Sequence, residues 1–231
     1  GTKKKAARKE YKETKRARLA RKHARSSVRS LSGAFDAVRT ARGATGAPTD
    51  GDQDLLRAAV VFAAGGLDIT IKELIRGSLR KLASSDEDVR EHFEKFTRGQ
   101  LKSNPEVGGK TDPAKFLAQL LVSESPYEKL IEGYIYNLTG SSLQSTEELF
   151  RAAAALDLNS KHLKENRANL KAAFDTRNDI IHELDVNFGG GTGQRQRKSR
   201  TKPQLEEQWT LLLETTDYFV KETERKLEEC K

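Results

Sequence analysis

Cysteine, aromatic residues and long apolar runs are all scarce in this chain of 231 residues. The single cysteine, Cys230, excludes a disulfide framework and a cysteine metal cage within one chain, so we expect a reducing, cytoplasmic setting. The longest apolar run, from Ala58 to Ile71, is interrupted by Asp68 and is shorter than the roughly 20 residues that cross a bilayer. We therefore expect no membrane span, and the basic N-terminus lacks the apolar stretch of a secretory signal.

Runs of β-branched residues are rare as well, which argues against a sheet protein. Charged residues make up 33% of the chain and aromatic residues only 6%, while Ala, Leu, Lys, Glu and Arg recur at helical spacing. No segment alternates apolar and polar residues with a period of two. The composition predicts an all-α protein that is long enough to bury a core without disulfides or metals.

Metal-ligand spacing and a phosphate-binding loop are also missing. His23, His92 and His162 lie apart from one another and from other ligand-type residues at suitable spacing. The glycine-rich stretch 189–193 lacks the Lys-Ser/Thr ending that a phosphate-cradling loop needs, and it is better interpreted as a flexible tether. We expect neither a metal nor another cofactor.

Positive charge is concentrated in two segments. Residues 1–30 hold thirteen Lys and Arg against two Glu, a net +11 in a chain of net +8, which leaves −3 for residues 31–231. A second basic cluster without acids follows the glycine run. Two basic segments on a mildly acidic body indicate a polyanionic partner, most commonly nucleic acid, although each segment alone is equally consistent with a solvated helix or tail. The candidate RNA-binding residues are Lys3, Lys4, Lys5, Arg8, Lys9, Arg16, Arg18, Arg21, Lys22, Arg195, Arg197, Lys198 and Arg200.

Capping residues, prolines and apolar spacing predict the helices. A long basic helix over 3–42 is expected to fray in its first half and to be ordered from about Ser27. Asp50 or Asp52 caps the most apolar helix, the expected core, over 53–83. We therefore divide the chain into a basic helical arm (1–45) and a helical domain (46–231), which includes a flexible basic loop at about 188–202. The remaining helices are predicted over about 86–102, 113–122, 126–139, 146–156, 160–186 and 203–229.

The helix predicted over 160–186 carries the most informative polar residues. Its apolar stripe is Leu163, Leu170, Ala173, Phe174, Ile181 and Leu184. Arg177 falls on this stripe, where a cation needs an anionic partner or an interface, because an unpaired buried charge is costly. Asn178 and His182 share a neighbouring polar face with Asp175 and Asp185. Since Arg177 and His182 are about 140° apart around the axis, they border a cleft rather than pair. The alternative to a functional site is that Arg177 forms an ordinary salt bridge and His182 is an ordinary surface residue.

The string from Arg177 to Asp185, Arg-Asn-Asp-Ile-Ile-His-Glu-Leu-Asp, resembles the motif of the HEPN superfamily, in which four to six residues separate Arg from His. The helix that begins at Leu55 also resembles the first long helix of its RiboL-PSP-HEPN branch. The resemblance implies a HEPN-like antiparallel helical bundle, here with additional helices. It also implies a homodimer in which two motif helices form one composite cleft.

The same resemblance implies a metal-independent RNA endonuclease of the toxin or antiviral-defence type. His182 would act as general base on a ribose 2′-hydroxyl or as general acid on the leaving oxygen. Arg177 would hold the scissile phosphate, and Asn178 would orient the phosphate or a neighbour. Glu183 and Asp185 are supporting candidates that tune the potential of the site or pair with Arg177.

Regulation and a non-catalytic role remain open. One branch of the superfamily has a tyrosine two residues after the histidine, as the target of a nucleotidyltransferase antitoxin. This chain has Leu184 there, so that form of control is not expected, although another antitoxin or regulatory partner is compatible with the sequence. The alternative function is a helical adaptor that binds RNA or protein without cutting, and the N-terminal helix could also serve oligomerisation.

Overall fold

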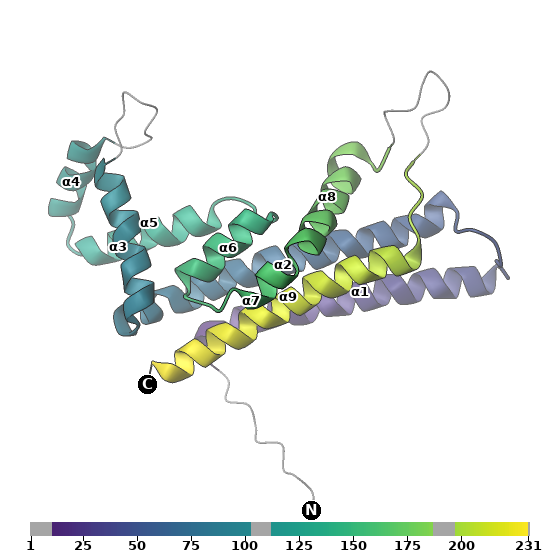
Figure 1. The fold of residues 1–231 in the computed structure, drawn as a ribbon, viewed down its shortest axis with the longest axis horizontal. Coiled ribbons are helices and arrows are strands. Elements are labelled where there is room, and N and C mark those ends of the chain that lie inside the picture. Colours follow the sequence, from purple (N-terminus) through teal and green to yellow (C-terminus); the bar gives the residue numbers. More distant parts are fainter. Residues whose placement is uncertain (1–10, 103–111, 187–196, 231) are drawn as a thin grey trace, which may run out of the picture.

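The computed structural model describes residues 11–102, 112–186 and 197–230 (Figure 1). Within these ranges the regular structure is helical apart from an isolated bridge between Val186 and Arg197, which confirms the predicted all-α fold. No helix in the described ranges is long and apolar enough to cross a membrane. After a 3-10 turn (Lys12–Thr14), the helices are α1 (Lys15–Ala41), α2 (Asp50–Ser85), α3 (Glu87–Lys102), α4 (Pro113–Leu121), α5 (Pro126–Thr139), α6 (Thr146–Ala155), α7 (Lys161–Glu165), α8 (Arg167–Glu183) and α9 (Lys202–Glu229).

Three long helices, α1, α2 and α9, pack against one another and form the body of the molecule (Figure 1). Helix α2 is the central core helix, as its composition predicted, and most of its apolar side chains are fully buried. Helix α1 runs antiparallel to α2, because Ala24 meets Gly66 while the earlier Glu13 meets the later Gly77. Gly66 therefore marks a close contact between the two helices.

Helix α1 is packed from its first turns, so the expectation that order begins only near Ser27 is wrong. Ala17, Ala24, Val28 and Phe35 are buried, and their spacings of seven and four residues place them on one face. Small alanines let the cationic helix approach α2 closely. Leu19, the first leucine of α1, lies off this stripe and is 54% exposed. Residues 15–41 thus belong to the same packed body as the following helices.

Several helix ends follow the predicted capping chemistry. Helices α4 and α5 begin at Pro113 and Pro126, as expected, and the Asp112 side chain accepts a hydrogen bond from the Ala114 N–H at 2.9 Å. The cap of α2 differs from the prediction. Thr49 is the N-cap, and Asp52 completes a capping box by accepting from the Thr49 N–H at 3.0 Å.

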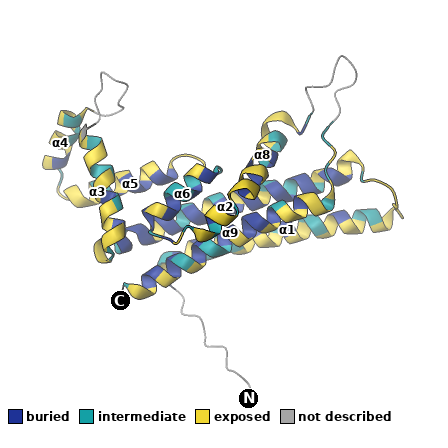
Figure 2. Cartoon of the chain, in the orientation of Figure 1, coloured by how far each residue is buried: buried dark blue, intermediate teal, exposed yellow. Residues whose placement is uncertain are grey.

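The helix predicted over 160–186 is instead two helices, α7 and α8, which are separated at Asn166. Helices α3, α4 and α5 form a lobe at one end of α2, which we call the α3–α5 lobe, and α8 projects from the same side of the three-helix body (Figure 1). Burial is concentrated where the long helices meet, whereas α4 and the end of α8 are largely exposed (Figure 2). The candidate motif therefore lies on a projecting helix end.

The close contact between α1 and α2 gives a matched pair of glycine substitutions. In Gly66→Ala the new Cβ would lie 2.1 Å from the Ala24 Cβ, so the helices must separate, and we expect a loss of about 1–3 kcal/mol of unfolding free energy. Gly65→Ala meets nothing within 4 Å and should stabilise the helix by about 0.5–1 kcal/mol. Urea unfolding followed by circular dichroism measures both; equal effects of the two substitutions would contradict this packing.

Candidate functional site

The C-terminal end of α8 is held in an unusual backbone conformation. Leu184 and Asp185 both adopt left-handed dihedrals, with φ of 51° and 58°, which cost non-glycine residues on the order of 1–3 kcal/mol each. The Asp185 N–H donates to the Asp179 carbonyl at 2.9 Å, and the Asp185 carbonyl accepts from the Lys198 N–H at 2.7 Å. These bonds end the helix sharply one residue after Glu183 and turn the chain back toward the body.

The Asp185 carboxylate is fully buried and lies between two arginines. Arg57 of α2 donates from Nε to its Oδ2 at 2.9 Å, and Arg200 donates from Nη2 to its Oδ1 at 2.7 Å. Burial acts to raise the pKa of Asp185, but the hydrogen bonds and charges of Arg200 and Arg57 outweigh it and hold the pKa below its ordinary value. The carboxylate thus joins α8, α2 and the segment before α9.

This placement corrects two expectations about Asp185. It does not share an exposed polar face with His182, because the chain has left the helix at Leu184, and it pairs with Arg57 and Arg200 rather than with Arg177. The sequence contained one signal of this network: Arg57 stands on the otherwise apolar, buried side of α2, where a cation needs a carboxylate.

Arg177 is half-buried, and in the described part of the chain no carboxylate lies within ion-pair distance of it. Its Nη1 donates to the Asn178 Oδ1 at 2.9 Å, while its Nε is buried without a hydrogen-bond partner. Burial lowers the pKa of the Arg177 guanidinium, an effect that the charge of Asp68 partly offsets. Asp68 is itself occupied by the Leu143 N–H and by Lys72, at 2.7 and 2.9 Å. Among the described residues no hydrogen bond uses the Arg177 Nη2, so this nitrogen, rather than the buried Nε, remains for an additional anion.

Asn178, His182 and Glu183 are exposed around this arginine. Because α8 is regular from Arg167 to Glu183, Arg177 and His182 point to different sides of one helix, as their spacing predicted, and no hydrogen bond joins them. One copy of the chain brings Arg177 and Asn178 together and leaves the imidazole of His182 facing solvent.

The apolar stripe predicted over 160–186 is correct for four of its six residues. Leu163, Leu170, Ala173 and Phe174 are buried, but Ile181 and Leu184 are 40% and 68% exposed. The physical reason is that the last turns of α8 extend beyond the helices that cover its beginning (Figure 2). Exposed apolar side chains thus lie next to the candidate motif.

The predicted RNA-binding cations fall into three groups. Several are paired within the chain: Arg18 with Glu224, Arg21 with Asp217, Arg197 with Asp54, Lys198 with Asp179, and Arg200 with Asp179 and Asp185. Lys22 and Arg16 are exposed, and Arg16 only approaches Glu73 at 3.8 Å. Lys3, Lys4, Lys5, Arg8, Lys9 and Arg195 lie outside the described residues.

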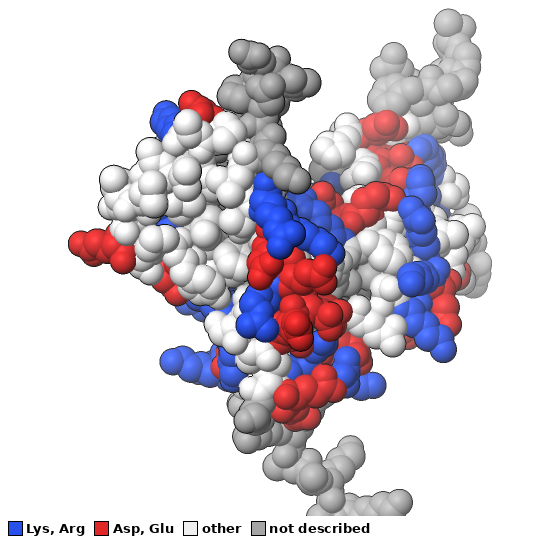
Figure 3. Space-filling view, turned by 60° about the vertical axis from the view of Figure 1, so that its left-hand side comes forward, with Lys and Arg blue, Asp and Glu red and all other residues white. Residues whose placement is uncertain are grey.

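These pairings change the expected surface. Residues 197–201, which we expected to lie in a flexible loop, contact the body of the protein through ion pairs. Arg197 pairs with Asp54 of α2, Lys198 with Asp179 of α8, and Arg200 with Asp185. On the face that Figure 3 displays, Lys and Arg side chains lie beside Asp and Glu side chains rather than in one continuous basic surface. Much of the described positive charge is therefore balanced locally.

A carboxylate cluster that the sequence did not suggest lies away from the motif. Oxygens of Asp86, Asp88 and Asp157 come within 4.8 Å of one another. The Lys226 ammonium lies against two of these residues, donating to Asp86 at 2.9 Å and also to Asp157. A lysine already supplies the positive charge, so the cluster is explained as a structural ion pair.

Comparisons of the chain with protein-family models, with curated proteins and with solved structures found no match.

The buried Asp185 network predicts a specific stability defect. Asp185→Asn removes the charge between two buried arginines and should lower the unfolding free energy at pH 7 by about 3–5 kcal/mol, whereas Asp175→Asn, in an exposed pair with Lys171, should change it by less than about 0.5 kcal/mol. Because the folded-state pKa of Asp185 is depressed, its contribution is present above the ordinary value of 3.8 and is lost as pH falls through the folded-state pKa.

Urea unfolding of the wild type and both variants between pH 7 and pH 3 measures this contribution. We expect part of the wild-type loss of stability below about pH 4 to be absent from Asp185→Asn, since that variant has no carboxylate to protonate at this position. The same acid-induced loss in the wild type and in Asp185→Asn would contradict the role assigned to the network.

Proposed function

We propose that this chain is a metal-independent RNA endonuclease of the HEPN type, acting in a toxin or antiviral-defence setting. The observation that carries the proposal is Arg177, a half-buried guanidinium without a carboxylate partner among the described residues, set next to exposed Asn178 and His182. A partly desolvated cation with available donors binds an anion such as phosphate well. The neighbouring imidazole belongs to the side-chain type best suited to proton transfer near neutral pH.

The proposed reaction uses the ribose 2′-hydroxyl of the substrate. His182 removes the 2′-hydroxyl proton as the oxygen attacks phosphorus, or a second His182 donates a proton to the departing 5′-oxygen. Arg177 holds the phosphate and opposes the charge that grows on its oxygens, and Asn178 fixes the guanidinium through the bond from Arg177 Nη1. The products are a 2′,3′-cyclic phosphate and a 5′-hydroxyl, and DNA should remain intact.

A homodimer is part of this proposal. Within one copy, Arg177 and His182 lie on different sides of α8, so a scissile phosphate contacted by both groups is best accommodated between two motif helices. The exposed Ile181 and Leu184 beside the motif offer apolar surface that a second copy would cover. Exposed Lys22 and Arg16 are candidates for contacts with the RNA backbone. A cytoplasmic location and a regulatory partner protein complete the proposal.

Cleavage of labelled RNA in EDTA tests the proposed activity. We expect the wild type to cut RNA but not DNA of the same sequence, and Arg177→Ala and His182→Ala each to reduce the rate by at least about a hundredfold. Arg167→Ala is the matched control, because it removes an exposed arginine, paired with Glu147, from the other end of the same helix. Its rate should equal that of the wild type.

Two results would count against the nuclease. Equal background cutting by the wild type, Arg177→Ala and His182→Ala would indicate contamination and favour the non-catalytic adaptor. Loss of wild-type cutting on addition of EDTA would contradict a metal-independent mechanism.

Light scattering after size-exclusion chromatography tests the dimer. Ile181→Glu places a charge on the exposed apolar surface beside the motif, and we expect it to yield monomers and to lower the cleavage rate in parallel. Leu19→Glu, at a side chain of similar exposure on α1, should leave both mass and rate unchanged. A fully active monomeric Ile181→Glu protein would refute the composite site.

A further inference from the structure

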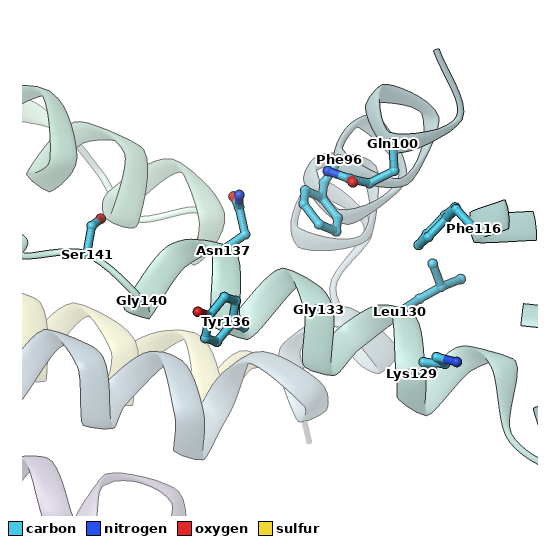
Figure 4. A pocket seen from close by; sticks show the side chains of 10 residues that line it. All are labelled: Phe96, Gln100, Phe116, Lys129, Leu130, Gly133, Tyr136, Asn137, Gly140 and Ser141. Carbon is cyan, nitrogen blue, oxygen red and sulfur yellow. The ribbon is translucent and has the colours of Figure 1, made fainter. Parts of the chain in front are cut away.

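The α3–α5 lobe contains a pocket that has no part in the chemistry proposed above. Its cavity volume is about 480 Å³, within the range of roughly 300–1,000 Å³ that is typical of small-ligand sites. One face of α5 forms its floor, and side chains from α3 and α4 close one end (Figure 4). We call it the lobe pocket; its lining residues are Phe96, Gln100, Phe116, Lys129, Leu130, Gly133, Tyr136, Asn137, Gly140 and Ser141.

Three aromatic rings dominate this lining. Phe96 of α3 and Phe116 of α4 lie on one side of the cavity, and Tyr136 of α5 lies on the other (Figure 4). Between them the floor is Gly133, where an added Cβ would meet nothing within 4 Å, so this space is open. Tyr136 is 76% exposed, which leaves its ring accessible to a ligand. A flat ring can therefore enter over Gly133 and stack on an aromatic face.

The polar part of the lining favours an anionic or neutral polar ligand over a cation. Among the described residues that line the cavity, Lys129 is the only charged one and none carries a carboxylate. Asn137 accepts from Arg151 through its side-chain oxygen, and no described residue accepts from its amide nitrogen. Ser141 adds a hydroxyl at the same end. Aromatic faces combined with amide, hydroxyl and ammonium donors are the chemistry that binds an unstacked nucleobase and its phosphate.

The segment after the lobe pocket leads toward the candidate site. Two residues after Ser141, the Leu143 N–H donates to Asp68 at 2.7 Å, and Asp68 is near enough to Arg177 for its charge to raise the pKa of the guanidinium. Helices α5 and α8 also lie on the same side of the three-helix body (Figure 1). One single-stranded RNA could therefore contact both places.

From these observations we infer that the lobe pocket binds a nucleobase of single-stranded RNA at a position away from the scissile phosphate. The inference rests on the proposed function for the identity of the polymer and extends it by a base-binding subsite. Stacking on Tyr136 above Gly133 supplies the affinity, and Lys129 contacts a flanking phosphate.

Binding of fluorescein-labelled single-stranded RNA, measured by anisotropy, tests the subsite in the cleavage-deficient His182→Ala background. Tyr136→Ala removes the stacking ring, and Gly133→Leu fills the floor; each should weaken binding about tenfold. Tyr136→Phe keeps the ring and should bind like the parent. Leu121→Ala is the matched control, since Leu121 is 76% exposed on α4 but does not line the cavity. Circular dichroism verifies that each variant is folded.

Crosslinking locates the base directly. RNA containing 4-thiouridine should crosslink to peptides that carry Phe116 or Tyr136, and Gly133→Leu should abolish that crosslink. Unchanged affinity in Tyr136→Ala and Gly133→Leu, or crosslinks confined to other helices, would overturn the subsite even if wild-type protein cuts RNA. If the wild type does not cut but both variants bind weakly and the crosslink maps here, the nuclease fails and the base pocket stands.

Discussion

The carboxylate of Asp185, enclosed by Arg57 and Arg200, determines where α8 ends and therefore where the candidate motif lies. Two consecutive left-handed residues are tolerated at this point because the buried ion pairs and the backbone bonds to Asp179 and Lys198 hold the chain there. Without them the helix could continue in its own direction. The structural charge cluster thus lies within the same short segment as Arg177, for which the described residues provide no carboxylate partner.

Local chemistry made most of the helices predictable. Prolines after capping residues placed α4 and α5, and the apolar richness of α2 identified the core helix. Tertiary contacts decided the rest. The packing of α1 depends on Ala17 and Ala24, whose small side chains looked uninformative beside so many lysines and arginines. Equally, periodicity placed Ile181 and Leu184 on the apolar stripe but could not reveal that both stay largely exposed in the described structure.

The sequence predicted which residues belong to the candidate site, but not which other residues contact them. Spacing correctly placed Arg177 and His182 on different sides of one helix. It could not show which carboxylate lies near Arg177. Asp185 pairs with the two arginines Arg57 and Arg200, whereas Asp68 lies near Arg177 but accepts its hydrogen bonds from other residues. Such assignments depend on which distant elements meet. The lobe pocket could not be predicted for the same reason. Its aromatic rings come from three different helices, and the sequence pattern of each helix does not show that the three meet.

The close contact of Ala24 with Gly66 has a consequence for how the basic N-terminal segment could have acquired, or could lose, its charge. The buried position of Ala24 is restricted to a small residue because Gly66 of α2 lies against it, whereas an exposed position such as Lys22 can vary without disturbing the helix pair. The charge of the exposed positions can therefore change while the residue at the helix contact cannot. Removing α1 from Lys15 onward would instead expose the buried face of α2. The effect of its charge can therefore be tested only by substituting single exposed side chains, and not by deleting the helix.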